Sequence, residues 1–143
     1  MAERPAYTEI EHTADVGLEL EAPDLETAFE QAAASMFDLM CDLDGVGDGV
    51  SRTIRATSRE GDLQGLMVRW LTELLFVFAS ERLLLSSFDV RRLEDGVIEA
   101  SVAGEQFDPD CHGMKTEIKA VTYHDLAVDQ TEGVWFVRVI FDT

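Results

Sequence analysis

The sequence predicts an α+β fold in which two main helices pack on a mixed or antiparallel β-sheet. Three observations carry this prediction: two strand-like pieces in residues 6–22, helical segments at 25–40 and 62–80, and hairpin-like strands in the last third. The order β-β-α-β-α, followed by several hairpin strands, is typical of this class. The chain has 143 residues, of which 46% are hydrophobic, so we expect one domain covering 1–143.

The first half supplies a strand and a helix. In DVGLELEA, residues 15–22, apolar and polar positions alternate, which predicts a strand with one wet face. Pro23 and Asp24 then end the strand, and Asp24 can cap a helix. Apolar residues recur at helical spacing through LETAFEQAAASMFDLM, residues 25–40, as in an amphipathic helix that covers a sheet.

The next segment, CDLDGVGDG, resembles a calcium-binding loop only in part. With Asp42 at position one, Asp44 falls at three and Gly47 at six, but Thr53 stands where the bidentate glutamate belongs. We therefore expect a mobile, acidic connector. A strand over 50–57 and a second helix from Asp62 to about Ser80 follow, with Phe76 opposite the apolar stripe and predicted to be exposed.

The rest of the chain is predicted to be β. Residues 87–95 and 96–104 flank an Asp95-Gly96 turn, a strong hairpin signal. Further strands are expected at 115–123 and 126–130, and Glu132-Gly133 forms the next turn. The final strand, 134–141, is apolar on both sides, which predicts a central strand with both faces covered.

The charge excludes some classes of function. The net charge is −18, with 29 acidic and 11 basic residues, of which Lys115 and Lys119 are the lysines. Such a surface repels phosphate backbones, so we expect no direct nucleic-acid binding and favour a basic protein partner or cations.

The start of the sequence, its most apolar window and its cysteines all bear on the cellular compartment. The first ten residues lack the apolar stretch of a secretory signal, and the most apolar window, 66–79, is too short for a membrane span. Cys41 and Cys111 stand apart from each other and from any histidine cluster. We therefore predict a cytoplasmic protein with reduced thiols and no membrane contact.

The histidines do not predict a catalytic centre. His112 lies in DCHGM, and His124 precedes Asp125, but neither has a nucleophile at a recognisable spacing. A lone histidine is more often structural or solvated than catalytic. No catalytic residue is predicted.

The strongest candidate site joins the two ends of the chain. Asp15 begins an early strand and Asp142 ends the last one, so antiparallel pairing of these strands would bring the two carboxylates together. The α-carboxylate of Thr143 would add a third negative group, and such groups repel unless a cation lies among them. Oxygen ligands suit Ca²⁺ or Mg²⁺, with Mn²⁺ as an alternative. Lys119 is a further candidate for this cluster, and separately solvated carboxylates are the competing interpretation.

Four ordered motifs resemble those of the archease family over nearly the whole chain. They are EHTADVGLEL, LETAFEQAAASMFDLM, HGMKTEIKAVTYHDLAV and the ending VRVIFDT. The resemblance implies a divalent-metal site, with Ca²⁺ the first choice, at Asp15, Asp142 and Thr143, and a functionally important lysine at Lys119. Thr143 stands where an apolar residue is common, but its ligand would be a main-chain oxygen.

The resemblance also implies a function. Archeases are accessory proteins of the RtcB-type RNA ligase in tRNA splicing and RNA repair. A similar protein would promote guanylylation of the ligase and multiple turnover, without a reaction of its own. Two alternatives remain: a general chaperone or scaffold for RNA-modifying enzymes that uses the surface around Phe76, and a metal-dependent phosphoesterase built on Asp15 and Asp142. The second lacks a convincing general base.

Overall fold

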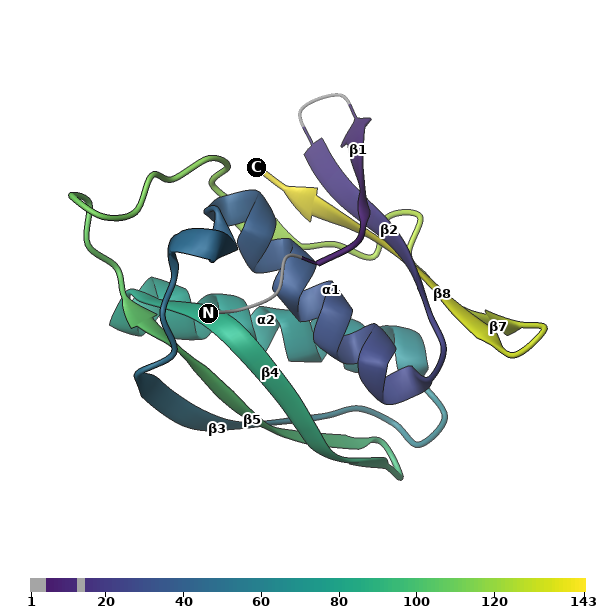
Figure 1. The fold of residues 1–143 in the computed structure, drawn as a ribbon. Helices are drawn as coiled ribbons and strands as arrows, with labels where there is room; N and C mark the ends of the chain where they lie inside the picture. The colour runs from purple at the N-terminus through teal and green to yellow at the C-terminus, as the bar shows by residue number, and fades with distance from the viewer. Residues whose placement is uncertain (1–4, 13–14) are drawn as a thin grey trace.

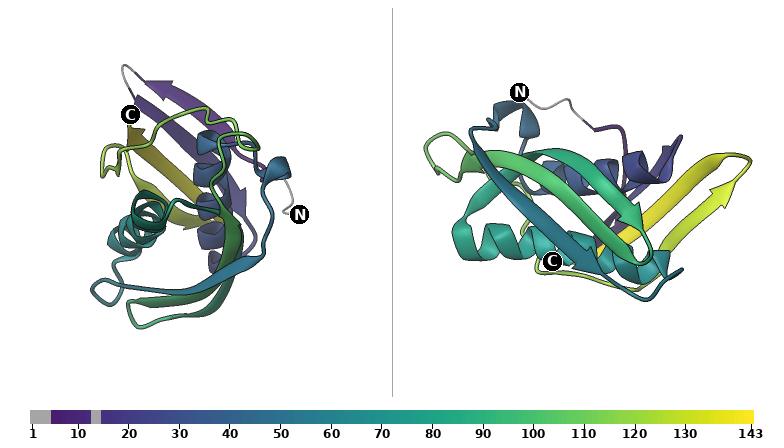
Figure 2. Two further views of the ribbon diagram at one scale, coloured as in Figure 1. Left: turned by 90° about the vertical axis from the view of Figure 1, so that its left-hand side faces the viewer. Right: turned by 90° about the horizontal axis from the view of Figure 1, so that it is seen from below.

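The fold has three layers, a five-stranded sheet, two helices and a three-stranded sheet (Figures 1 and 2). The structure is a computed structural model and describes residues 5–12 and 15–143. Both helices contact strands of both sheets, and one continuous hydrophobic cluster joins the layers. The α+β prediction is confirmed, but the strands form two antiparallel sheets where the sequence suggested one.

The five-stranded sheet brings together the first two and the last three strands of the chain. It contains β1 (Thr8–His12), β2 (Asp15–Ala22), β6 (Ala120–Val121), β7 (Ala127–Thr131) and β8 (Val134–Asp142). β8 pairs antiparallel with β2 on one edge and with β6 and β7 on the other, and β1 pairs with β2. The predicted antiparallel pairing of the early and final strands is therefore confirmed.

The three-stranded sheet is built on a hairpin. β3 (Val50–Thr57) and β4 (Leu83–Glu94) flank β5 (Val97–Gln106). Asp95 and Gly96 form the turn between β4 and β5 with φ angles of 54° and 75°. Two positive φ angles in a two-residue loop match the twist of the strands, so this hairpin prediction is confirmed.

The first helix, α1 (Leu25–Met40), begins and ends as its sequence predicts. The Asp24 carboxylate accepts the Thr27 N–H at 2.8 Å, and hydrogen bonding by the Thr27 side chain first, and then by this N–H, lowers the pKa of Asp24. The buried face includes four alanines, which allow the helix to approach its neighbours closely. These are Ala28, Ala32, Ala33 and Ala34.

The second helix, α2 (Leu63–Glu81), starts after the cap Asp62 and ends at Arg82, whose φ of 55° turns the chain into β4. It is 19 residues long with a mean hydropathy of 1.2, enough by length and composition to cross a membrane, which corrects the expectation from its most apolar window. However, 56% of that span is buried within the fold, as expected for a core helix. The indole N–H of buried Trp70 donates to the Phe29 carbonyl at 3.0 Å and ties α2 to α1.

Two strand predictions need correction. Of residues 115–123, only Ala120 and Val121 are strand: Ala120 already pairs with Asp142, the last residue of β8, and the chain turns soon after Thr122, which donates its N–H to the Ile140 carbonyl. β8 is central, but its second face is covered only in part: Val137, Val139 and Phe141 are buried on the first face, whereas on the second Ile140 is buried and Val134 is 36% exposed. The β7–β8 hairpin extends past the helices, which leaves Val134 at its end exposed (Figure 1).

The acidic connector is anchored more firmly than its composition suggested. It contains a short 3-10 helix, η1 (Leu43–Gly45), and buries Leu43 and Val46 in the core. Gly47 donates its N–H to Glu105 at 3.0 Å and accepts the Ser86 hydroxyl at 2.8 Å. Residues 42–49 are therefore held by their apolar side chains and main-chain polar groups, which the count of aspartates and glycines does not reveal.

Candidate functional site

The structure places Asp15 and Asp142 directly opposite each other on β2 and β8. Opposite residues in an antiparallel pair share one face of the sheet, with Cα atoms about 4.5–5.5 Å apart. The next pair, Val16 and Phe141, is buried against the helices, so the two carboxylates lie on the outward face. The C-terminus accordingly lies beside the start of β2 (Figure 1).

Lys119 adjoins this pair through its main chain. Its N–H donates to the Asp142 carbonyl at 2.8 Å, and the following residue, Ala120, lies opposite Asp142 in the register. The short strand β6 thus joins Lys119 to the end of β8. Thr143 is the neighbour of Asp142 in the chain, so the structure brings all four predicted residues to one corner of the sheet.

The donor chemistry of this corner fits a hard divalent cation. Two carboxylates on one face and the terminal oxygens of Thr143 are the ligands that Ca²⁺ or Mg²⁺ prefers. Within residues 5–12 and 15–143, no group of three His, Cys, Asp or Glu side chains could hold a metal. Thr143 or water would therefore have to complete the set. Thr13 and Ala14 of the HTAD motif lie outside the described residues.

A glycine supports the close pairing behind the site. A Cβ added to Gly17 would lie 2.6 Å from the Val139 carbonyl oxygen and 2.6 Å from Cδ1 of Ile140. The missing side chain leaves room for Ile140, which is buried although it lies on the outward face. Further along, Arg138 of β8 bonds Glu19 of β2 at 2.7 Å. Two contacts therefore support the strand pairing that positions Asp15: the packing of Ile140 beside Gly17, and the ion pair between Arg138 and Glu19.

His112 is a structural residue, in agreement with the prediction. It is 4% exposed, and its Nδ1 accepts the Asp108 N–H at 2.9 Å while Nε2 lies 2.8 Å from Glu105. Because Nδ1 is an acceptor, the ring proton resides on Nε2 and is donated to Glu105. The Gly47 N–H first, and then His112, lower the pKa of Glu105.

The other reactive side chains do not extend the site. His124 lies 3.4 Å from Asp125 with both side chains exposed. Cys41 and Cys111 are free thiols, as expected. Burial raises the pKa of Cys41, and a hydrogen bond to Asp108 raises that of Cys111, so neither favours the thiolate form.

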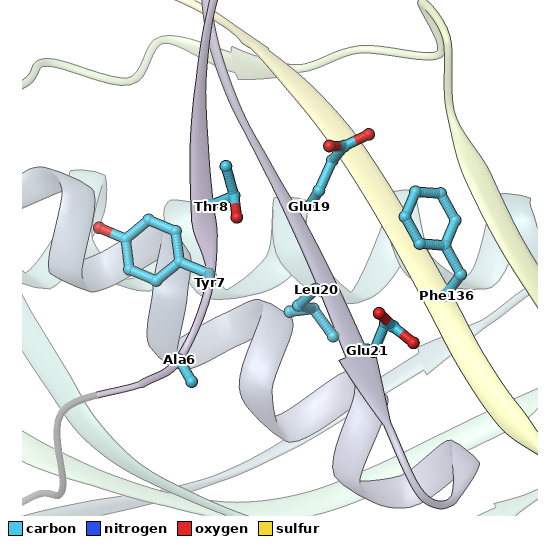
Figure 3. Close-up of a pocket in the computed structure, with 7 residues that line it drawn as sticks. All are labelled: Ala6, Tyr7, Thr8, Glu19, Leu20, Glu21 and Phe136. Carbon is cyan, nitrogen blue, oxygen red and sulfur yellow. The ribbon is translucent and has the colours of Figure 1, made fainter.

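A hollow lies elsewhere on the sheet. It has a volume of about 460 Å³ and opens where β1 begins beside β2, between Tyr7 and Phe136 (Figure 3). Glu19 lines it but is bound by Arg138, and the hydroxyl of Tyr7 donates to buried Asp38. Glu19 lies four positions after Asp15 in β2, about 13 Å along a strand, so this hollow is distinct from the carboxylate pair.

A second hollow adjoins the candidate site and was missed by sequence reasoning. It measures about 310 Å³ and lies between the end of α2 and residues 117–119, so Lys119 borders it. Arg82, after the last residue of α2, lines it as well. The lining residues come from two segments that are distant in the sequence and contact each other only in the folded protein. The scarcity of lysine was the one feature of the sequence that pointed to Lys119.

Comparison with known proteins agrees with the fold and with the motifs. The model of the Archease protein family (MTH1598/TM1083) matches residues 7–143. A protein archease from Methanopyrus kandleri is 40% identical over 139 residues, which cover 95% of this chain and 98% of that protein. A protein archease from Methanosarcina mazei is 37% identical over 140 residues, covering 95% and 94%.

Two solved structures have the same fold. The solution structure of Methanobacterium thermoautotrophicum protein 1598 matches with a TM-score of 0.82 and 34% identity, over 96% of this chain and 98% of that chain. The crystal structure of an archease from Thermotoga maritima, described as a possible chaperone, matches with a TM-score of 0.62 over 94% of both chains. Its identity is 18%, so it supports the fold alone.

Proposed function

The chain belongs to the archease family, and from this premise we propose that it is an accessory protein of an RtcB-type RNA ligase. In this role it promotes guanylylation of the ligase and multiple turnover in tRNA splicing and RNA repair, and it carries out no reaction of its own. The observation that carries the proposal is the pairing of Asp15 with Asp142, next to the main chain of Lys119.

We assign the metal site to Asp15, Asp142 and the terminal oxygens of Thr143. A divalent cation bound there, with Ca²⁺ the first choice, would supply positive charge and open coordination positions at the surface of the protein. Asp15 and Asp142 would hold it from two paired strands. The rigid pairing of β2 with β8 fixes the two carboxylates relative to each other, which favours a defined geometry over a flexible acidic patch.

The remaining charge determines what this corner can approach. With a net charge of −18 the protein repels RNA, so we expect it to act on the ligase without holding the substrate. A ligase that binds RNA needs a basic surface around its site, which attracts an acidic partner. Electrostatic attraction of this kind mainly raises the association rate and weakens at high salt.

Multiple-turnover RNA ligation by the cognate ligase tests the proposal. We expect the wild-type protein to raise the number of turnovers, and Asp15→Asn and Asp142→Asn to abolish this effect with the fold intact. Glu21→Gln is the matched control, because Glu21 is an exposed carboxylate on the same face of β2. Variants at Asp15 and Asp142 that stimulate as well as the control would remove both carboxylates from the mechanism.

A general chaperone role is the second candidate, because one observation favours it. Phe76 is 64% exposed on the outer side of α2, as predicted, and offers an apolar contact. Thermal aggregation of unrelated client proteins separates the two functions. A dedicated ligase activator protects none of them, whereas a chaperone that uses this surface protects several and loses the effect with Phe76→Ser.

A further inference from the structure

The hollow between α2 and residues 117–119 combines an apolar floor with two cations. Leu75, Phe78 and Ile118 provide apolar surface, while Arg82 and Lys119 stand at its walls. Its volume of about 310 Å³ accommodates one or two side chains of another molecule. A concave apolar surface with a few charged groups is the usual form of a specific binding pocket.

The two cations are unusual on this protein. The chain has 11 basic residues against 29 acidic ones, and half of the described arginines, Arg52, Arg91, Arg92 and Arg138, are paired with carboxylates. Within the described part of the chain, neither Arg82 nor Lys119 forms a salt bridge. Both side chains therefore keep unused capacity for an anion.

Arg82 is nevertheless held in place. Its guanidinium carbon lies 4.4 Å from the ring centre of Phe78 and 5.1 Å from that of Phe107. Cation–π contacts occupy the face of a guanidinium, and the N–H groups at its edge stay available for a carboxylate. A preorganised cation loses less entropy on binding than a mobile one.

We infer that this hollow binds a segment of a partner protein in which an apolar side chain stands next to a single carboxylate. The apolar side chain contacts Leu75, Phe78 and Ile118, and the carboxylate lies between Arg82 and Lys119. Glu117 also lines the hollow and opposes a second negative charge, which disfavours a phosphate dianion. Charge complementarity to Arg82 and Lys119, together with the apolar lining, identifies the occupant as acidic and apolar.

This inference adds a second contact site to the proposed function. It rests on that function only for the identity of the partner. Lys119 borders the hollow and bonds Asp142 through its N–H, so one partner can reach both places. The carboxylates of Asp15 and Asp142 attract a positively charged group of the partner, and the cations of the hollow attract a negatively charged group. Opposite charges side by side fix the orientation of a partner, because the reversed arrangement places like charges together.

Two small probes with the same apolar body and opposite charges test the binding chemistry. In an NMR titration of the full chain, we expect 4-phenylbutyrate to shift the amides of Ala79, Arg82, Ile118 and Lys119. The matched amine, 4-phenylbutylamine, should leave them unchanged. Equal shifts with both probes, or shifts by the anion only at other sites, would overturn the inference.

Variants then assign the charges. Lys119→Gln and Arg82→Gln should each weaken binding of 4-phenylbutyrate about fivefold, the loss expected for one solvent-exposed ion pair of about 1 kcal/mol. Arg91→Gln is the control, because Arg91 is exposed and paired with Asp89 far from the hollow. If Arg82→Gln fails to fold, Lys119→Gln still tests the claim, since the fold uses the main-chain N–H of Lys119.

Ligase stimulation separates this inference from the proposed function. We expect the Arg82→Gln variant to reach half-maximal stimulation of the ligase at a concentration about five times that of the wild-type protein. The Arg82→Lys variant should reach it at a lower concentration than Arg82→Gln. Probe binding at the hollow together with wild-type behaviour of Arg82→Gln would overturn the partner assignment alone. Probe binding without any stimulation by the wild-type protein would overturn the proposed function and support the pocket.

Discussion

Asp15 of β2 lies directly opposite Asp142 of β8, on the face of the sheet that points away from the helices. Strand pairing thus places two carboxylates side by side where neither can be buried. Most surface carboxylates in a protein of this charge can separate to reduce repulsion. The main chains of these two residues cannot, because the strand pairing holds Asp15 and Asp142 opposite each other.

The first prediction concerns metal binding. We expect Ca²⁺ to raise the melting temperature of the wild-type protein, because a ligand that binds only the folded state adds about 2.7 kcal/mol at 100 times its dissociation constant. Asp15→Asn or Asp142→Asn should abolish this rise, and Glu21→Gln should keep it. Calorimetric titration with Ca²⁺ and Mg²⁺ measures the affinity directly. Calcium binding that survives in both Asn variants would place the metal elsewhere.

The second prediction tests the strand pairing without changing a charge. Gly17→Ala should destabilise the fold and weaken metal binding, because the new Cβ would lie 2.6 Å from the Val139 carbonyl oxygen. Adding Ile140→Val should restore little, because the clash with the main chain remains. Urea unfolding and calcium titration of the single and double variants provide the measurements. A fully stable Gly17→Ala protein would show that the two strands can separate without loss.

The third prediction concerns Glu30, whose carboxylate accepts the Val90 N–H at 2.8 Å. Burial raises its pKa above the ordinary 4.5, so the ionised form costs stability in the folded protein. This cost is present above the folded pKa and is relieved as the pH falls from there to 4.5. Glu30→Gln should therefore be more stable than wild type at pH 7, with a difference that shrinks near pH 4.5.

Glu30→Ala serves as the matched control for this effect. It leaves the Val90 N–H without its acceptor and should lose roughly 1 kcal/mol at both pH values. Urea unfolding of wild type and both variants at pH 7 and pH 4.5 gives the comparison. A glutamine variant less stable than wild type at pH 7 would mean that the bond to a charged acceptor outweighs burial.

The fourth prediction has the opposite sign. The pKa of Glu105 is lowered, chiefly by the Gly47 N–H and then by His112, so its ionised form stabilises the fold. This contribution is present above the ordinary pKa of 4.5 and is lost as the pH falls through the lower, folded value. In hydrogen exchange, Glu105→Gln should reduce protection of the Gly47 and Asp108 amides at pH 7.

Glu99→Gln is the control for Glu105, because Glu99 lies on the same strand and bonds only the exposed Arg92. It should leave protection of Gly47 and Asp108 unchanged. Equal loss of protection in both variants would indicate a general effect of charge on β5, and not the specific contact with Gly47 and His112.

The elements that the sequence predicted well are those with local signals. Asp24 caps the first helix as expected, the second helix begins one residue after the expected Asp62, and Asp95-Gly96 adopts the φ angles that its hairpin requires. The opposition of Asp15 and Asp142 followed from one further step, the antiparallel pairing of two strands. The metal assignment and the role of Lys119 remain predictions.

The features that escaped prediction depend on distant partners. Residues 115–119 have a strand-like sequence, yet they are not strand because they precede Ala120, which already pairs with Asp142, the last residue of β8. Val134 is apolar and exposed because the β7–β8 hairpin extends beyond the helices. The hollow at Arg82 and Lys119 arises where α2 meets a loop, and no pattern within either segment encodes that meeting.

The pairing of β2 with β8 has a consequence for biosynthesis. A ribosome that adds 5–20 residues per second delivers Asp15 on the order of ten seconds before Asp142. Throughout that interval the nascent polypeptide holds one half of the pair and lacks the strand that completes it. Premature termination anywhere before β8 would leave products without the paired carboxylates, so only molecules translated to the last strand could compete for the partner.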